Sequence, residues 1–142
     1  MQINIVIEDV KPITHNNAIK PSTRGKFVTM YKTEMGRKFE TEMQLKLCNY
    51  LYEFDRLNKS YREDEHYLVV DFRFYMPVLT QKKLISKKSC DVDGLIKYTQ
   101  DVIFGYLEPD DSQIISVSST KIHSEKFRIE ADIKVRSLNN IL

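Results

Sequence analysis

The middle of the chain holds acidic side chains and a lysine that could bind a metal ion and act on a phosphate. Two aspartates one residue apart are followed, four residues later, by a lysine and then by an acidic pair; they are Asp91, Asp93, Lys97, Asp110 and Asp111. Two carboxylates about 4 Å apart repel each other by about 4 kcal/mol at an effective dielectric of about 20, which a bound cation offsets. Carboxylate ligands favour Mg²⁺ or Mn²⁺ over zinc. Such an ion would activate water and polarise a phosphate, with Lys97 neutralising developing charge, so the pattern predicts a metal-dependent DNA nuclease.

The segment after Asp91 must position these groups. From Val92 onward, apolar residues recur at the helical period, which predicts an amphipathic helix to roughly Tyr106. Residues two apart point to opposite sides of a helix, so we place Asp91 at or before the N-cap. Asp93 and Lys97, four apart, share one face. The positive end of the helix dipole favours ionised carboxylates at this position.

The later acidic pair cannot easily reach the same place within one chain. A helix from Gly94 to Tyr106 is roughly 20 Å long, so Asp110 and Asp111 should emerge at the end opposite Asp91. A two-fold dimer with antiparallel helices would bring each helix start beside the acidic pair of the other subunit. We therefore expect composite sites at a dimer interface. Convergence of the three acids within one subunit would refute this expectation.

Each feature also has a purely structural interpretation. An Asp before a helix is commonly only an N-cap, and Glu108-Pro109-Asp110-Asp111 would make an ordinary turn between a helix and a strand. A pair of aspartates one residue apart is weak evidence by itself. Its combination with Lys97 and a second acidic pair favours a metal site.

The arrangement of these residues resembles that of RusA-type Holliday junction resolvases, the crossover junction endodeoxyribonucleases. The shared pattern consists of Asp91-Val92-Asp93, Leu95, Lys97, Asp101 and an acidic pair followed by a strand. It covers about thirty residues, and the order of the expected elements fits over nearly the whole chain. Gly94 departs from the family, which usually has Asn after the second Asp.

The resemblance implies a homodimeric, Mg²⁺-dependent endonuclease that resolves four-way DNA junctions by paired symmetrical nicks in recombination and repair, with Mn²⁺ as a possible substitute. It assigns Asp91, Asp93 and Asp111 to the metal and to catalysis, with Asp110 as the alternative third acid. Lys97 matches the catalytic lysine of the family.

Basic residues gather in two segments outside the helix. Residues 11–38 contain seven basic residues against the single acid Glu34, among them Arg24 and Lys26. Residues 80–90 contain no acid and lead directly into Asp91; their basic residues are Lys82, Lys83, Lys87 and Lys88. Lysines contact phosphates without regard to base sequence, so these six residues are predicted DNA contacts. A solubilising loop and a solvated face are the alternatives, and Lys121 is at most a peripheral contact.

Composition and periodicity predict the fold that carries the site. The chain of 142 residues, 42% hydrophobic and 30% charged, suits one globular domain over residues 1–142. Alternation predicts strands over residues 1–10 and 66–76, a short strand over 26–31, and a hairpin formed by 113–122 and 127–136. Helical periodicity predicts a long helix over 33–57 with Cys48 in the core. We expect an α/β (α+β) domain with a mixed sheet of about five strands and two main helices, in a RusA-like two-fold dimer.

Other functions and locations are weighed on the same residues. No segment is long and apolar enough to cross a membrane, and the N-terminus lacks a signal-peptide pattern, so we expect a cytoplasmic protein of a bacterial or phage-infected cell. A catalytically silent DNA-binding module would need the basic segments but no metal. Another metal-dependent transferase using Asp91-Val92-Asp93 would need a nucleotide pocket, and no phosphate-binding loop is recognisable.

Overall fold

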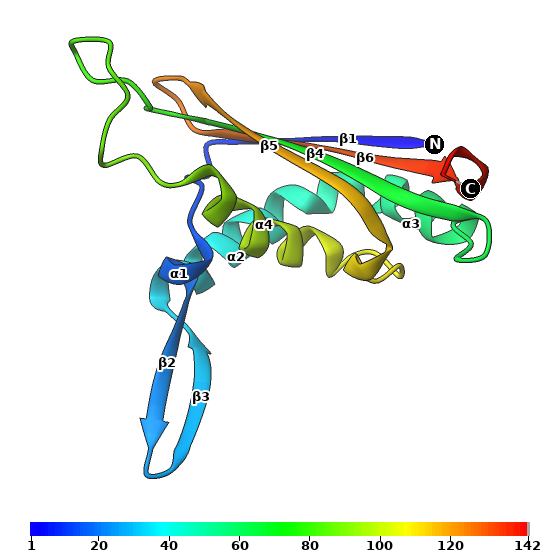
Figure 1. The fold of residues 1–142 in the computed structure, drawn as a ribbon, viewed down its shortest axis with the longest axis horizontal. Coiled ribbons are helices and arrows are strands. Elements are labelled where there is room, and N and C mark those ends of the chain that lie inside the picture. Colours follow the sequence, from blue (N-terminus) through cyan, green and yellow to red (C-terminus); the bar gives the residue numbers. More distant parts are fainter. Residues whose placement is uncertain (142) are drawn as a thin grey trace.

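A four-stranded mixed sheet with helices on one face forms the body of the molecule (Figure 1). The computed structural model describes residues 1–141. In the strand order β1-β6-β4-β5, β1 (Gln2–Glu8) and β4 (His66–Met76) each pair antiparallel with β6 (Arg128–Ser137). β5 (Ile114–His123) pairs parallel with β4 at the outer edge. The expected α+β class with a mixed sheet is confirmed. Within the described residues, no helix is long and apolar enough to cross a membrane.

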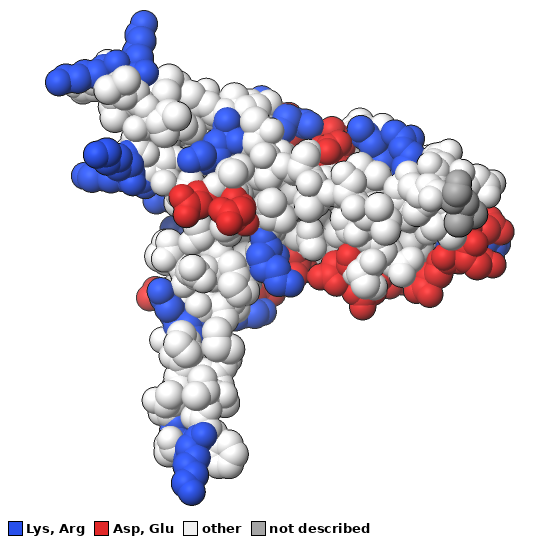
Figure 2. Space-filling model, in the orientation of Figure 1, with Lys and Arg blue, Asp and Glu red and all other residues white. Residues whose placement is uncertain are grey.

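A separate two-stranded hairpin projects from this body (Figures 1 and 2). Its strands, β2 (Ile19–Arg24) and β3 (Phe27–Lys32), pair only with each other, and we call residues 19–32 the arm. Gly25, at φ +63°, makes the turn in the left-handed region that glycine adopts without strain. The main sheet therefore has four strands, because the predicted short strand lies in the arm instead.

Two prolines and two asparagines in residues 11–24 are typical of a loop, but this segment is not one continuous loop. Residues 11–24 instead contain the single helical turn α1 (His15–Ala18), capped by Thr14, and the whole of β2. Pro21 signals a loop in sequence, yet it is tolerated here because each strand of a two-stranded hairpin has a free edge.

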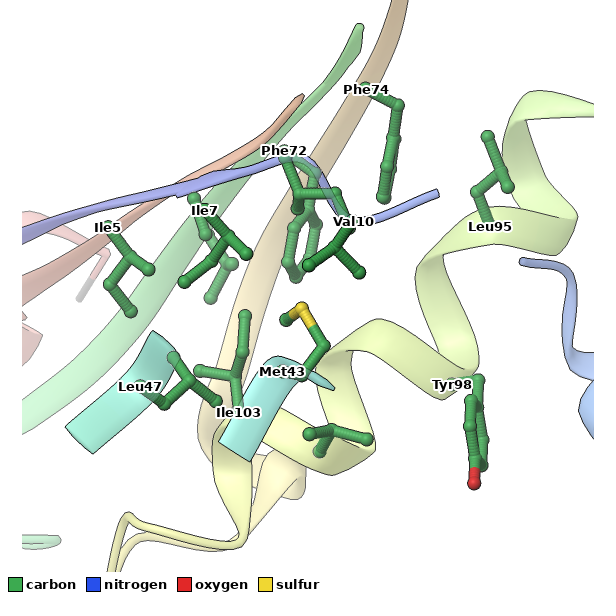
Figure 3. Close-up of a cluster of buried hydrophobic side chains, with 14 of the residues drawn as sticks. Ile5, Ile7, Val10, Met43, Leu47, Phe72, Phe74, Leu95, Tyr98 and Ile103 are labelled. Carbon is green, nitrogen blue, oxygen red and sulfur yellow. The ribbon is translucent and has the colours of Figure 1, made fainter. Parts of the chain in front are cut away.

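The core lies between the sheet and the helices (Figure 3). Strict alternation turns one face of β1, β4 and β6 inward, which confirms the expected strand pattern. From the helix side, α2 (Glu34–Leu47) contributes Met43 and Leu47, and α4 (Val92–Phe104) contributes Leu95 and Ile103. Burying one such side chain stabilises the fold by about 1.5–3 kcal/mol, so this layer fixes where α4 lies against the sheet.

The long helix expected over residues 33–57 is broken. A 3-10 turn, Cys48–Tyr50, separates α2 from α3 (Leu51–Ser60). The Tyr50 hydroxyl accepts a hydrogen bond from Val6 N–H (2.9 Å) and donates one to Val6 O (3.1 Å), so the break places this ring on the outer edge of β1. Cys48, predicted to be a core thiol, is exposed.

The predicted hairpin over residues 113–136 was also wrong, although both of its strands exist. β6 lies between β1 and β4, whereas β5 lies on the far side of β4, so the two strands are not neighbours. The burial of the two strands agrees with these positions. β6 buries Ile129, Ala131 and Ile133 on one face and suits a central position, while β5 is largely exposed and suits an edge.

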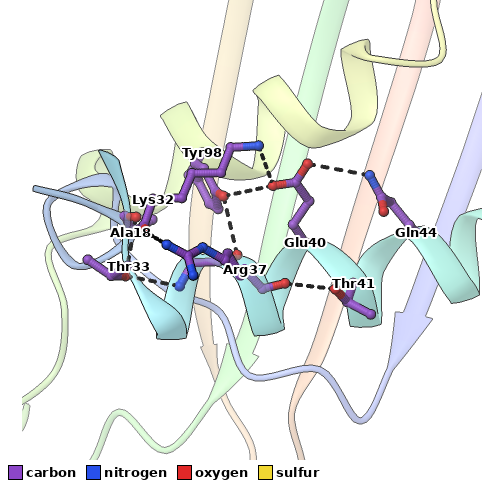
Figure 4. Close-up of polar contacts among 9 residues, drawn as sticks. Ala18, Lys32, Thr33, Arg37, Glu40, Thr41, Gln44 and Tyr98 are labelled. Carbon is purple, nitrogen blue, oxygen red and sulfur yellow. Dashed lines mark hydrogen bonds and ion pairs between the residues drawn. The ribbon is translucent and has the colours of Figure 1, made fainter. Parts of the chain in front are cut away.

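A polar network joins the root of the arm to the helices (Figure 4). Tyr98 of α4 donates from its hydroxyl to Gly36 O (3.2 Å) and lies 3.2 Å from a carboxylate oxygen of Glu40, which also binds Lys32 at 2.7 Å. A Cβ at position 36 would lie 2.5 Å from Ala18 O, so glycine allows the root to pack directly on α2. α4, which starts after Asp91, thus also supports the arm.

Candidate functional site

Asp91 and Asp93 lie at the start of α4 with their carboxylates exposed. Asp91 is the N-cap residue, as expected, but its side chain makes no capping hydrogen bond. Among residues 1–141, neither carboxylate takes part in an ion pair or a side-chain hydrogen bond of the structure. The capping role that would explain Asp91 structurally is therefore not performed, and both groups are free to bind a cation.

Two side chains of β5 hold the start of α4 in place. Lys121 Nζ donates to Cys90 O (2.7 Å) and to Ser89 Oγ (2.9 Å), and Ser119 Oγ donates to Val92 O (3.4 Å). Sequence reasoning missed both anchors and treated Lys121 as a peripheral DNA contact. The available signal was their spacing, because residues two apart on a strand face the same side of the sheet.

Lys97 points toward the second acidic pair. Its Nζ lies 3.5 Å from Asp101 Oδ1 and 3.9 Å from Asp111 Oδ2. All three side chains are substantially exposed, so these ion pairs contribute little to stability. The structure therefore brings Lys97 together with Asp111 and Asp101 of the same chain, although Lys97 and Asp93 lie on adjacent turns of α4.

Asp110 and Asp111 have different surroundings. The Asp110 carboxylate accepts a hydrogen bond from Ser112 N–H (2.9 Å), which lowers the pKa of Asp110, as does its hydrogen bond with Asp111. The pKa of Asp111 is raised, first by that hydrogen bond with Asp110, then by partial desolvation and the negative charge of Asp110. Lys97 acts in the opposite direction. A bound cation would relieve the repulsion that raises the pKa of Asp111.

One chain does not bring the acids together. Both members of the second pair line a depression with Phe104 and Gly105, at the end of α4 opposite Asp91. Within residues 1–141, no group of three or more His, Cys, Asp or Glu is placed to hold a metal ion. The carboxylate ligands fit a hard divalent cation in their chemistry, but a single chain presents them as separate halves.

The predicted DNA contacts fall into two separate groups. Lys82, Lys83, Lys87 and Lys88 are exposed in the loop between β4 and α4, which the Leu79–Ile85 bridge narrows into a small hairpin. Figure 2 shows basic side chains at this end of the molecule and acidic ones over the start of α4. Arg24 and Lys26 flank the turn at the tip of the arm. Both groups are exposed and lie outside the core.

Comparison with known proteins identifies the family of this chain. The family model for Endodeoxyribonuclease RusA matches residues 9–134, which includes α4, both acidic pairs and the loop lysines. A comparison with curated proteins finds no match to this chain. Because the matched region spans most of the 142 residues, the chain belongs to the RusA family and is an endodeoxyribonuclease that resolves Holliday junctions by divalent-metal-dependent hydrolysis of DNA phosphodiester bonds.

Proposed function

We propose that this protein is a Mg²⁺-dependent resolvase that introduces paired symmetrical nicks into four-way junctions during recombination and repair, with Mn²⁺ as a substitute. Its ligands are Asp91 and Asp93 of one subunit and Asp111 of the second subunit. The observation that carries this proposal is the separation of the two acidic groups along α4, with the first pair unpartnered and exposed. A two-fold dimer with antiparallel helices would join the halves into two equal sites.

Each residue has a distinct role in the proposed reaction. Asp91 and Asp93 provide two of the metal ligands, at a helix start that Lys121 and Ser119 hold in place. When bound, a divalent ion supplies water activation and polarisation of the scissile phosphate. Lys97 faces Asp111 of its own subunit, and in the site to which that Asp111 contributes it neutralises the charge that develops on the phosphate oxygens. Asp110 holds the turn in which Asp111 lies.

The choice of Asp111 over Asp110 as the third ligand rests on their hydrogen bonds. Asp110 is occupied in capping the turn Asp111–Gln113 through Ser112 N–H. Asp111 instead directs an oxygen toward Lys97. A ligand must be able to turn a lone pair to the metal without dismantling the local structure, and Asp111 meets this requirement better.

The basic groups position the junction. The four loop lysines precede Asp91 in the chain and would hold the scissile strand at the site. Arg24 and Lys26 lie at the tip of the arm and would contact a more distant part of one duplex branch of the junction. Replacement of the four loop lysines by Ala should weaken junction binding and reduce the salt dependence of the affinity by about 0.9 in log–log slope for each lost phosphate contact. Lys46 and Lys59, exposed on α2 and α3, provide a matched control pair for loss of surface charge.

Cleavage of defined substrates tests the proposal. Wild-type protein and Asp91→Asn are incubated with a labelled mobile four-way junction or with linear duplex, in Mg²⁺, in Mn²⁺ or in chelator. We expect paired symmetrical nicks confined to the junction, absent with chelator and with the variant. Cleavage that persists in chelator would contradict metal dependence, and equal cleavage of the duplex would contradict junction selectivity.

A further inference from the structure

The two outer edges of the main sheet, β1 and β5, differ in the hydrogen bonding of their backbone groups. At the outer edge of β1, the Tyr50 hydroxyl satisfies both the N–H and the C=O of Val6. At the outer edge of β5, within residues 1–141, no backbone or side-chain group forms a comparable hydrogen bond with residues 115–121. One edge is therefore blocked at Val6 by a side chain of the same chain, whereas the other edge is open.

The open edge carries few of the features that usually prevent pairing, and its one irregularity, at Ile115, lies near the start of β5. Exposed edge strands are commonly protected by lysine, proline or inward-pointing charge, and β5 has no charged residue before Lys121. Its middle exposes two apolar side chains, Ile115 at 58% and Val117 at 45%. A ten-residue strand of this kind is suited to accept another strand.

The register of β5 shows which residues face outward. Ser124 N–H donates to Met76 O, so the backbone groups of residue 124 point toward β4. Backbone direction alternates along a strand, and Val117, Ser119 and Lys121 therefore turn their N–H and C=O groups to the open edge. Val117 lies midway between Asp111, just before the strand, and His123 at its end.

The two ends of β5 mark the two halves of the proposed metal site. Asp111 begins the 3-10 turn Asp111–Gln113 that leads into the strand. Near its far end, Lys121 and Ser119 hold the backbone at Cys90 and Val92, on either side of Asp91. A second β5 running antiparallel, with Val117 opposite Val117, would bring the start of each strand, which the turn Asp111–Gln113 precedes, alongside the far half of the other strand.

We propose that β5 pairs antiparallel with β5 of a second copy, with the two-fold axis at Val117. The pairing joins the two four-stranded sheets into one of eight strands and packs the exposed Val117 side chains against each other. The β5 pairing rests on the proposed function, because the pairing brings Asp111 of one copy to the start of α4 in the other and so assembles the composite site. The occupant of the open edge is therefore the same chain.

Disulfide cross-linking tests the register. In a background with Cys48→Ser and Cys90→Ser, Val117→Cys places two thiols on opposite residues with Cα atoms about 5.5 Å apart, within disulfide range. We expect mild oxidation to convert most of this variant into a covalent dimer that reductant reverses. Thr120→Cys, exposed on the same strand, is the matched control, because its two copies would lie roughly 20 Å apart. A mixture of Ser116→Cys and Ser118→Cys should cross-link, and neither should do so alone.

Sedimentation of the untreated wild-type protein at micromolar concentration should show a dimer. A monomer, absence of the Val117→Cys cross-link, or equal cross-linking of Thr120→Cys would overturn the proposed pairing. The outcome is separable from catalysis. Cross-linking at position 117 in a protein that cleaves no junction would contradict only the proposed function, whereas cleavage by a dimer that does not cross-link there would contradict only the β5 interface.

Discussion

The two ends of α4 carry acidic residues in opposite situations. At its start, Asp91 and Asp93 are exposed and, within residues 1–141, make no ion pair or side-chain hydrogen bond. Beyond its other end, Asp110 caps a turn and Asp111 faces Lys97. Acids that contribute nothing to their own subunit are the ones that a ligand can engage without breaking native interactions. Under the proposed function, the first pair would serve the metal site alone, while the second would combine a structural residue, Asp110, with a ligand, Asp111.

Neutralising the first pair should have the largest effect on cleavage and almost none on stability. Asp91→Asn and Asp93→Asn keep the side-chain shape but remove the ligand charge, so we expect single-turnover cleavage of a four-way junction to fall by about 10³-fold, comparable with loss of a central electrostatic contact. The Tm should change little, because no hydrogen bond is lost and the interaction of one exposed carboxylate with the helix dipole is at most about 1 kcal/mol. Asp64→Asn, an exposed acid elsewhere, is the control. Retained activity, or a clearly lowered Tm, would remove the distinction between the two ends.

The second pair should separate when its members are changed one at a time. Asp111→Asn should reduce cleavage by about 10²-fold or more and leave the Tm unchanged, because its contact with Lys97 is long and exposed. Asp110→Ala should lower the Tm through loss of the cap on Ser112 N–H and affect cleavage less. Single-turnover rates and thermal unfolding of both variants decide the assignment. The reverse pattern would make Asp110 the ligand.

Lys97 lies on α4 between the two acidic groups, so its substitution distinguishes an effect on the phosphate from an effect on the metal ligands. Lys97→Met should reduce cleavage by roughly 10²-fold at saturating metal, since it removes charge stabilisation but no ligand. Metal affinity, measured by calorimetry with Mn²⁺, should change little or rise. A strong loss of metal binding with this variant would show that Lys97 organises the acids instead of acting on the phosphate.

The pH dependence should also depend on the second pair. The hydrogen bond and charge of Asp110 raise the pKa of Asp111. On acidification, Asp111 is therefore protonated, and loses the carboxylate that binds metal, at a higher pH than an ordinary aspartate. Asp110→Asn removes the neighbouring charge, and the acid limb of Mn²⁺ binding should therefore move to lower pH. Glu108→Gln, in the same segment between α4 and β5, is the control. An unmoved acid limb would contradict the coupling.

A change inside α4 that touches neither end should have the smallest effect on cleavage. Tyr98→Phe removes the hydroxyl that binds Gly36 O and Glu40, at a cost of about 1 kcal/mol of folding free energy. Burial raises the pKa of Tyr98 to about 12, so the group stays protonated at neutral pH and no pH effect is expected. Chemical denaturation and the cleavage assay measure the two quantities. A loss of cleavage larger than the loss of stability explains would tie the arm root to the active site.

Local patterns in the sequence were sufficient for the elements that carry the site. Alternation located β1 and β4, and the helical period placed α4 with Asp91 as its N-cap. These features depend on residues close in the chain or on simple periodicity.

Features that depend on distant parts of the chain were missed. The insertion of β6 between β1 and β4 is a choice among strand pairings that the residues of positions 113–136 do not specify by themselves. The same holds for Tyr50, which reaches Val6 across 44 positions, and for Lys121, which anchors Cys90 across 31. The arm was hidden because its side chains are exposed on both faces, so β2 and β3 lack the alternation of a half-buried strand.

Mixing of two inactive variants tests the composite site most directly. Asp91→Asn and Asp111→Asn chains, carrying different tags, are co-expressed, and the mixed dimer is purified through both tags. If each site takes Asp91 from one subunit and Asp111 from the other, the mixed dimer has one site with both lesions and one intact site. We predict that it nicks the junction at about half the wild-type rate per dimer, while each parent variant is inactive. A mixed dimer as inactive as its parents would show that both acids act within one subunit and would contradict the account.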